Sequence, residues 1–356
     1  MDRRWICSDV WMDILPSFDR PQLGLKMALL SDRFDVLVDK HFDGTTELTL
    51  WSPIKTYEGI GSKAKLSVLI NGKDVRFPMP DHPLPNKIRF RFFQIDYIDH
   101  SVTTFFRSNK HIWDRMGINL ELFCANVQPI WDVLAREILP IFATNIRHLY
   151  VPDGDHLDNL RRHTSPTILT DLDQLNSIYS GGLLPDVIAD DGPNSTVGQV
   201  LSKWLHSPTK NGQPKRFRRN NFFGQPNLEW VNNFKEVHFR TTSVSYNIQL
   251  YFRMPTTPIE QFELVNKVTH EKLTLKLSEE SIELVYNWML KRCPIGETAP
   301  IKWKNRENSG ANFNYISDLI LRYGNNWCAN LNSVRFELRG KHCIGPLSPS
   351  AVEELD

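Results

Sequence analysis

The chain has 356 residues, of which 41% are hydrophobic and 11% aromatic, and its formal net charge is +1. This length suggests about two domains, and the apolar fraction is large enough for packed cores, which excludes a disordered chain. The nearly balanced charge gives no general attraction to nucleic acid or to an anionic membrane.

The sequence shows no segment typical of a membrane or secreted protein. No apolar run approaches the ~20 residues needed to span a bilayer. The first ten residues, MDRRWICSDV, are not followed by the apolar stretch of a secretory signal. The five cysteines are scattered and lack C-x-x-C spacing, which is typical of reduced thiols. We therefore expect a cytoplasmic or nuclear protein without a membrane partner.

The first 44 residues predict three short helices. Val10, Ile14 and Phe18 recur at helical spacing behind Ser8, and Pro16 should kink or end this helix. The second helix should begin near Pro21 with Leu23, Met27, Leu30 and Phe34, and the third should carry Leu37, Val38 and Phe42 before Gly44. Such helices bury little surface alone, so they are either a cap on a larger core or a module that docks on another protein.

This stretch resembles an F-box, whose pattern runs roughly Leu-Pro-x-Glu-Val-Leu-x-x-Ile-Leu, then a break, then a helix ending Leu-Val-Ser-Lys-Arg-Trp. The chain departs from the pattern at Cys7, Asp32 and Phe34, which replace a proline, a basic residue and a tryptophan. The resemblance implies docking on the Skp-family adaptor of a cullin–RING ubiquitin ligase. The residues that would contact the adaptor are Ile6, Val10, Trp11, Ile14, Leu15, Leu29, Leu30 and Phe34.

The next 200 residues mix strand and helix patterns. Residues 46–78 alternate around Asn71-Gly72, which predicts a β-hairpin, and the prolines of residues 80–86 predict a linker. From residue 88, strand-like pieces such as 118–123 and 146–151 alternate with helical ones at 100–116 and 129–142. This alternation predicts a mixed α/β fold.

One strand shape recurs, with apolar residues at its first, fourth and sixth positions. It occurs at Ile146, Leu149 and Val151, at Phe234, Val237 and Phe239, and at Leu331, Val334 and Phe336. This shape is typical of the strand of a leucine-rich repeat (LRR), although an ordinary parallel sheet explains it equally well.

After residue 240 the pattern becomes β-rich. Residues 244–254 alternate, residues 262–267 and 272–277 predict an antiparallel pair, and Ser278 should begin a helix. The predicted parts are an F-box-like helical module (1–44), a hairpin and linker (45–86), an LRR-like α/β region (87–240), a β-rich portion with a helix (241–345) and an acidic tail (346–356).

Two further segments, residues 202–222 and 258–295, resemble segments of a large F-box protein expansion in nematodes, especially plant-parasitic ones. In that expansion the F-box-like start, a TP-x-x-x-G-x-PK stretch and a FEL-x-N-x-x-T-x-E-x-L stretch recur in this order. The resemblance implies a diversified target-binding region, an unknown protein target and no catalytic residues.

The strongest local charge feature is the stretch KNGQPKRFRRNNFF at residues 210–223. Its cations are Lys210, Lys215, Arg216, Arg218 and Arg219, interleaved with phenylalanines. We interpret it first as a solvated loop, second as a loop for an acidic protein partner, and third as a nucleic-acid contact.

Motifs for catalysis, metals and cofactors are weak. GIGSKAK (59–65) lacks the frame of a phosphate-binding P-loop, and no G-x-S-x-G occurs. DGDHLDNLRRH (153–163) fails the EF-hand frame, so we predict a solvated turn. We expect no metal, cofactor or enzymatic activity. The two alternatives to an F-box-like substrate-recognition subunit are a stand-alone LRR-like interaction module and an enzyme with an unfamiliar site.

Overall fold

The computed structural model describes residues 7–19, 22–41, 48–50, 54–59, 61, 63–70, 73–84, 88–90, 92–114, 117–210, 212–221, 228–237, 244–253, 259–277, 285–296 and 332–347. The chain divides into two compact units. Residues 1–145 and 330–356 form the first unit, and residues 146–329 form the second. The boundary therefore falls inside the region that the sequence pattern had grouped as residues 87–240.

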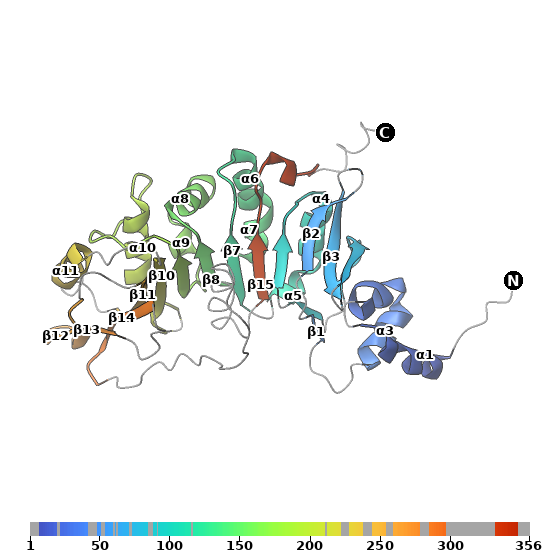
Figure 1. Cartoon of the computed structure of the whole chain (residues 1–356), viewed down its shortest axis with the longest axis horizontal. Helices are drawn as coiled ribbons and strands as arrows, with labels where there is room; N and C mark the ends of the chain where they lie inside the picture. Colours follow the sequence, from blue (N-terminus) through green and yellow to red (C-terminus); the bar gives the residue numbers. More distant parts are fainter. Residues whose placement is uncertain are drawn as a thin grey trace. The chain divides into compact units, whose positions relative to one another are not determined.

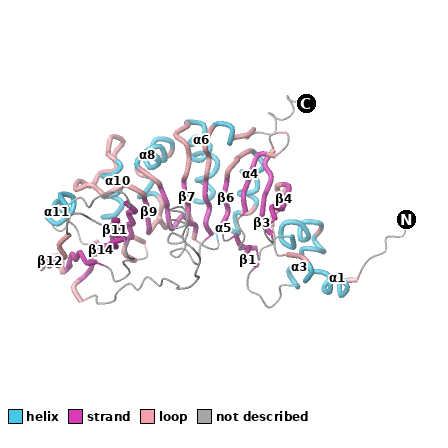
Figure 2. The backbone as a smooth tube through the Cα atoms, viewed as in Figure 1, coloured by secondary structure: helices cyan, strands magenta, loops and turns pink. Residues whose placement is uncertain are grey.

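Short helices alone make up the N-terminal part of the first unit (Figure 2). They are α1 (Ser8–Ile14), the 3₁₀ turn η1 (Leu15–Ser17), the π turn η2 (Leu23–Met27), the 3₁₀ turn η3 (Ala28–Leu30) and α3 (Asp32–His41). As predicted, α1 ends just before Pro16, where the missing amide hydrogen prevents a further helical bond. Ser31 is extended and separates η3 from α3, so Phe34 belongs to the third helix rather than the second.

The first unit contains a sheet in the order β7-β15-β6-β2-β3-β4 (Figure 1). Strands β2, β6, β15 and β7 are parallel, whereas β3 and β4 form the predicted antiparallel hairpin. A separate parallel pair joins β1 (Leu48–Leu50) to β5 (Ile88–Phe90). The strand bounds are β2 Ile54–Glu58, β3 Ala64–Ile70, β4 Lys73–Pro78, β6 Phe92–Ile95, β7 Ile118–Leu122 and β15 Asn332–Phe336.

Strand β15 lies between β7 and β6 although it is the last described strand of the chain. Ser333 pairs with Phe92 of β6 on one side and with Asn119 of β7 on the other. The returning C-terminal segment therefore completes the hydrogen bonding of two strands that precede it by more than 200 residues.

Helices of the first unit bury aromatic side chains against one face of the sheet. They are α4 (His100–Ser108), α5 (Lys110–Asp114), α6 (Gln128–Val133), the π turn η4 (Leu134–Ile138) and α7 (Leu139–Phe142). Phe93 of β6 lies 5.7 Å from Phe105 and 6.0 Å from Trp113, measured between ring centroids, and all three are fully buried. Burying a side chain of this size stabilises a fold by about 1.5–3 kcal/mol. Since side chains alternate along a strand, Gln94 faces the other side of the sheet, as does Lys55, its partner on β2.

The second unit contains a sheet in the order β12-β13-β14-β11-β10-β9-β8. Strands β8 to β11 are parallel, and β14, β13 and β12 continue the sheet in antiparallel pairs. The strands are β8 Ile146–Val151, β9 Ser177–Ser180, β10 Lys215–Asn221, β11 Tyr246–Arg253, β12 Phe262–Asn266, β13 Glu271–Leu277 and β14 Val285–Pro294. The helices are α8 Gly154–His163, α9 Ile168–Asp171, α10 Val197–His206 and α11 Leu228–Val237.

A fully buried ion pair joins β13 to β14. Both the Nε and the Nη2 of Arg292 donate to Oε2 of Glu271, at 3.1 and 2.7 Å. In the turn that precedes β13, the side chain of Asn266 accepts the backbone amides of Val268 and Thr269. The ion pair connects the two halves of the segment 258–295, whereas the Asn266 bonds shape the turn between β12 and β13.

The mixed α/β class is confirmed, and so are the strands at 118–122 and 146–151 and the antiparallel pair β12–β13. The helix predicted after Ser278 is wrong from Val285 onward. These residues form a strand in which alternate side chains, such as Trp288 and Leu290, are buried in the core. Phe234 and Val237, predicted in a strand, belong to α11. Asn71-Gly72, Phe239, Leu331, Phe42 and Gly44 lie outside the described residues, as do residues 348–356 of the predicted tail.

Residues 153–163, predicted as a solvated turn, form helix α8. Asp153 caps this helix by accepting the amide of His156 at 3.1 Å. Within the described residues, no helix combines the length and the apolarity that crossing a membrane requires.

Candidate functional site

The N-terminal helices have a small core of their own. Its buried members are Leu15, Leu23, Met27, Ala28, Leu37 and Val38. Around it pack the partly buried Trp11, Met12, Phe18 and Phe34, and the rings of Trp11 and Phe34 meet edge to face with centroids 4.8 Å apart. This aromatic contact holds the first helix against the third.

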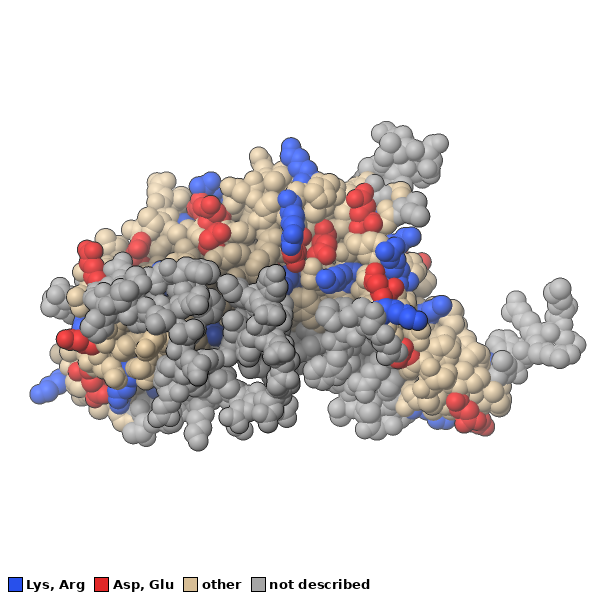
Figure 3. All heavy atoms as spheres, viewed as in Figure 1, with Lys and Arg blue, Asp and Glu red and all other residues tan. Residues whose placement is uncertain are grey.

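Several apolar side chains on these helices remain exposed. Val10 is 45% exposed, Leu30 58% and Val36 65%, and we call these three the exposed apolar set. One comes from α1, one from η3 and one from α3. In Figure 3 the visible side of this part is mostly uncharged, with acidic side chains at its lower edge. Because covering such side chains is favourable, the set marks a surface suited to another protein.

The residues predicted to contact an adaptor divide into three groups. Val10 and Leu30 are exposed, whereas Trp11, Ile14, Leu29 and Phe34 are half-buried. Leu15 is fully buried and fills the core, so it cannot touch a partner while the module stays folded. Ile6 lies outside the described residues. Val36 was not singled out from the sequence. The one indication in the sequence is that Val36 is an apolar residue outside the row of core positions in an aspartate-rich helix.

Five aspartates lie on the two helices that carry Val10 and Val36, α1 and α3. They are Asp9 and Asp13 on α1, and Asp32, Asp35 and Asp39 on α3. Burial raises the pKa of Asp35, and the charges of Asp39 and Asp32 raise it further. A partner with basic side chains around an apolar centre would relieve this repulsion.

The basic stretch is a strand inside the second unit, so the prediction of a loop is wrong for residues 215–221. It forms β10 between β9 and β11. Arg218 is buried with its guanidinium 5.3 Å from the ring centroid of Tyr179 and 4.3 Å from that of Tyr251. These rings stabilise a cation that a solvated loop would have left in water.

The other cations of this stretch are also buried, half-buried or paired within the protein. Lys215 is buried, its ammonium donates to the carbonyl of Trp204, and burial lowers its pKa to about 8. Burial also lowers the pKa of the half-buried Arg216 and Arg219. Only Lys210 is exposed, and it pairs with Asp173. Lys210, Lys215 and Arg218 therefore already interact within the protein, and Arg216 and Arg219 are half-buried.

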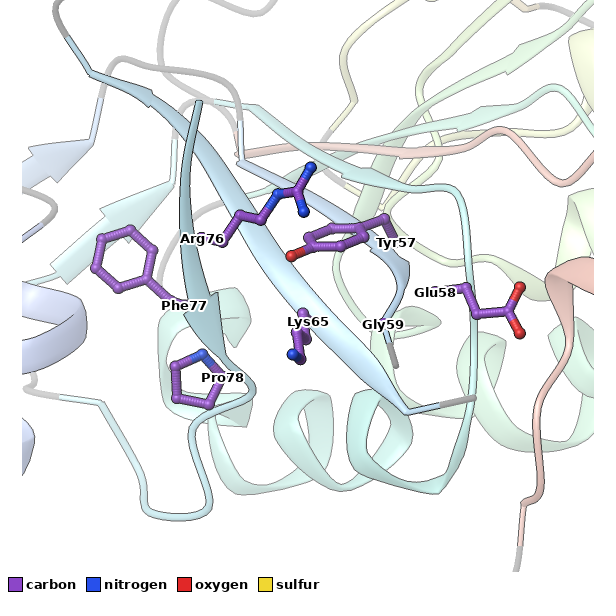
Figure 4. Close-up of a pocket in the computed structure, with 7 residues that line it drawn as sticks. All are labelled: Tyr57, Glu58, Gly59, Lys65, Arg76, Phe77 and Pro78. Carbon is purple, nitrogen blue, oxygen red and sulfur yellow. The ribbon is translucent and has the colours of Figure 1, made fainter. Parts of the chain in front are cut away.

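The face of the first unit's sheet opposite its described helices carries polar side chains and two adjoining cavities. The first cavity, of about 440 Å³, lies over β2, β3 and β4 (Figure 4). Its lining residues are Tyr57, Glu58, Gly59, Lys65, Arg76, Phe77 and Pro78. The second, of about 520 Å³, shares Tyr57 and Glu58 with the first and lies at the carboxyl ends of β2, β6 and β15. Ligands of α/β sheets bind at this end of parallel strands.

The second cavity is lined by three acids, Glu58, Asp96 and Glu337, and by the cations Lys55 and Arg339. The Nε2 of Gln94 donates to Asp96 at 2.7 Å and to Glu337 at 3.0 Å, which holds the two acids side by side. Burial raises the pKa of Asp96, and the charge of Glu337 raises it further. Burial, with the charges of Asp99 and Glu58, raises the pKa of Tyr97 to about 12, so its hydroxyl stays protonated at neutral pH.

Among the described residues, no three His, Cys, Asp or Glu side chains are grouped to hold a metal. Cys7, Cys124, Cys293 and Cys343 form no disulfide, and of these four Cys7 alone is exposed.

No protein-family model matches the chain, and neither the curated proteins nor the solved structures contain a match to it. The F-box resemblance therefore rests on the residues named above and on the helical N-terminal part that they form.

Proposed function

We propose that this chain is an F-box-like substrate-recognition subunit of a Skp–cullin–RING ubiquitin ligase. The observation that carries the proposal is the N-terminal helical part, which has its own core and still exposes Val10, Leu30 and Val36. A part that needed these side chains only for its own stability would bury them. Their exposure is what docking on a second helical protein requires.

The proposed mechanism is proximity rather than chemistry by the chain itself. The helices would hold the adaptor, and the two α/β units would hold a protein target. Tethering both to one scaffold raises the effective concentration of target lysines near the ubiquitin-charged enzyme. The open polar face of the first unit, with its two cavities, offers one surface for such a target.

The test is calorimetric titration of the full chain with a Skp-family adaptor. The informative variant is Leu30→Asp/Val36→Asp, because both side chains are exposed and their replacement leaves the helical core intact. The matched control is Ile188→Asp, which places a charge on an equally exposed apolar residue (65%) of the second unit.

We expect sub-micromolar binding by the unmodified chain and by the Ile188 variant. If each exposed residue contributes about 2 kcal/mol, as interface hot spots do, the double variant should bind at least ~100-fold more weakly. Failure of a folded, unmodified chain to bind the adaptor would remove ubiquitin from the proposal. The remaining interpretation would then be a stand-alone interaction module.

A further inference from the structure

The first cavity of the polar sheet face brings together two cations from neighbouring strands. Lys65 lies on β3 and Arg76 on β4, and both line the cavity with Tyr57 of β2. Figure 4 shows the tyrosine hydroxyl on the same side of its ring as Arg76 and Lys65. The guanidinium carbon of Arg76 lies 5.2 Å from the centroid of that ring.

The polar groups of this cavity are poorly satisfied by the protein. The hydroxyl oxygen of Tyr57 is buried and has no hydrogen-bond partner. Within the described residues, Lys65 has no ion pair, and the only carboxylate near Arg76 is Asp74, at 3.6 Å from its Nε. Asp74 also accepts the hydroxyl of Ser67. A buried donor without a partner costs free energy that a bound acceptor would recover.

Gly59 helps to place the lysine. A Cβ at this position would lie 2.8 Å from the backbone oxygen of Lys63 and 2.9 Å from both Cδ and Cε of Lys65, so the glycine lets the lysine stem pass close to the end of β2. Glu58, the one acid that lines the cavity, directs its carboxylate away from Lys65 and Arg76 in Figure 4. Away from Glu58, the cavity therefore presents the positive charges of Lys65 and Arg76 and the hydroxyl of Tyr57.

We propose that this cavity binds a phosphate group, either free or as a monoester. A lysine offers a point charge and an arginine a planar fork, and together with a hydroxyl they match the oxygens of a tetrahedral dianion. The cavity volume of about 440 Å³ falls in the ~300–1,000 Å³ range of small-molecule sites. It leaves room beside the Tyr57 ring for an organic group that carries the phosphate.

This site differs from the P-loop that the glycines of residues 59–65 superficially suggest. In a P-loop the backbone amides cradle the phosphate. Here the binding groups are side chains of three strands, and Lys65 alone comes from the glycine-rich stretch. The inference does not depend on the docking function proposed above, because free phosphate compounds test it without an adaptor.

The experiment is calorimetric titration of the full chain at low salt with three probes: inorganic phosphate, O-phosphoserine and phenyl phosphate. We expect saturable binding in the millimolar range or tighter, weakened about tenfold or more by either Lys65→Gln or Arg76→Gln. Lys73→Gln is the matched control, because this exposed lysine begins β4 and does not line the cavity. Tyr57→Phe should weaken binding without lowering the melting temperature, since its hydroxyl has no protein partner.

Tighter binding of phenyl phosphate than of inorganic phosphate would assign the site to esters, and equal binding would assign it to free phosphate. The proposal is overturned if none of the three probes binds saturably. It is equally overturned if Lys73→Gln weakens binding as much as Lys65→Gln, because the effect would then reflect the general charge of the hairpin.

Discussion

Removing Arg292 should expose how strongly the second unit depends on its buried ion pair. The side chains of Arg292 and Glu271 are both buried. Two nitrogens of the Arg292 guanidinium donate to one carboxylate oxygen of Glu271. Methionine is apolar, unbranched and flexible, so Arg292→Met removes the charge while keeping much of the buried volume. The carboxylate of Glu271 would then be a buried charge without its cation.

Breaking one partner of a buried pair costs about 3–5 kcal/mol, because the remaining ion has lost its solvent and its counter-charge. Replacing both partners by apolar side chains is often nearly neutral. We therefore expect Arg292→Met to lower the free energy of unfolding by ~3–5 kcal/mol, or the melting temperature by roughly 6–20 °C. Glu271→Leu/Arg292→Met should recover most of this loss.

Urea unfolding followed by tryptophan fluorescence measures these differences, since Trp288 lies on β14 four residues before Arg292. A double-mutant cycle with Glu271→Leu gives the coupling energy of the pair. If the losses of the two single variants simply add in the double variant, the pair does not act as a unit and the reasoning is refuted.

Three further outcomes follow from the described residues. Leu15→Ala should destabilise the N-terminal helices by about 2–5 kcal/mol, measured by thermal unfolding, because Leu15 is central to a core of only six buried residues. Iodoacetamide at pH 8 should label Cys7 and spare Cys124, whose pKa burial raises to about 12; equal labelling of both in mass spectra of the folded chain would contradict this. Burial, with the charges of Arg216 and Arg147, lowers the pKa of His148 to about 4, so the unfolded chain takes up its proton near pH 6.5 before the folded chain does. The free energy of unfolding should therefore fall as the pH is lowered from 6.5 to 4. In the His148→Asn variant, unfolding curves should show a smaller fall over this range.

Local sequence patterns predicted those helices and strands whose apolar spacing alone determines their secondary structure. The hairpin β3–β4 and the strand β13 alternate apolar and polar residues in the sequence, and the pairing of β3 with β4 and of β13 with β12 follows. The N-terminal helices were predicted because their apolar spacing and Pro16 act within a few residues. For these elements the sequence contains the interactions that form them.

The failures occur where distant partners decide the outcome. Arg218 looks like a solvent-exposed cation, and only the packing of Tyr179 and Tyr251 from neighbouring strands makes an interior strand possible. The spacing of apolar residues in 279–290 resembles a helix, but pairing with β11 and β13 makes Val285–Leu290 part of strand β14. The cavity of Lys65 and Arg76 was equally hidden, because strand register rather than a contiguous motif brings the two cations together.

The position of β15 between β6 and β7 has a consequence for synthesis on the ribosome. β6 and β7 both pair with this strand, yet its residues emerge only after the whole second unit has been made. At ~5–20 residues per second, the two waiting strands spend roughly ten seconds to most of a minute with open edges. Open edges of this kind invite pairing with other chains, so the nascent first unit is a natural client for chaperones until its last strand arrives.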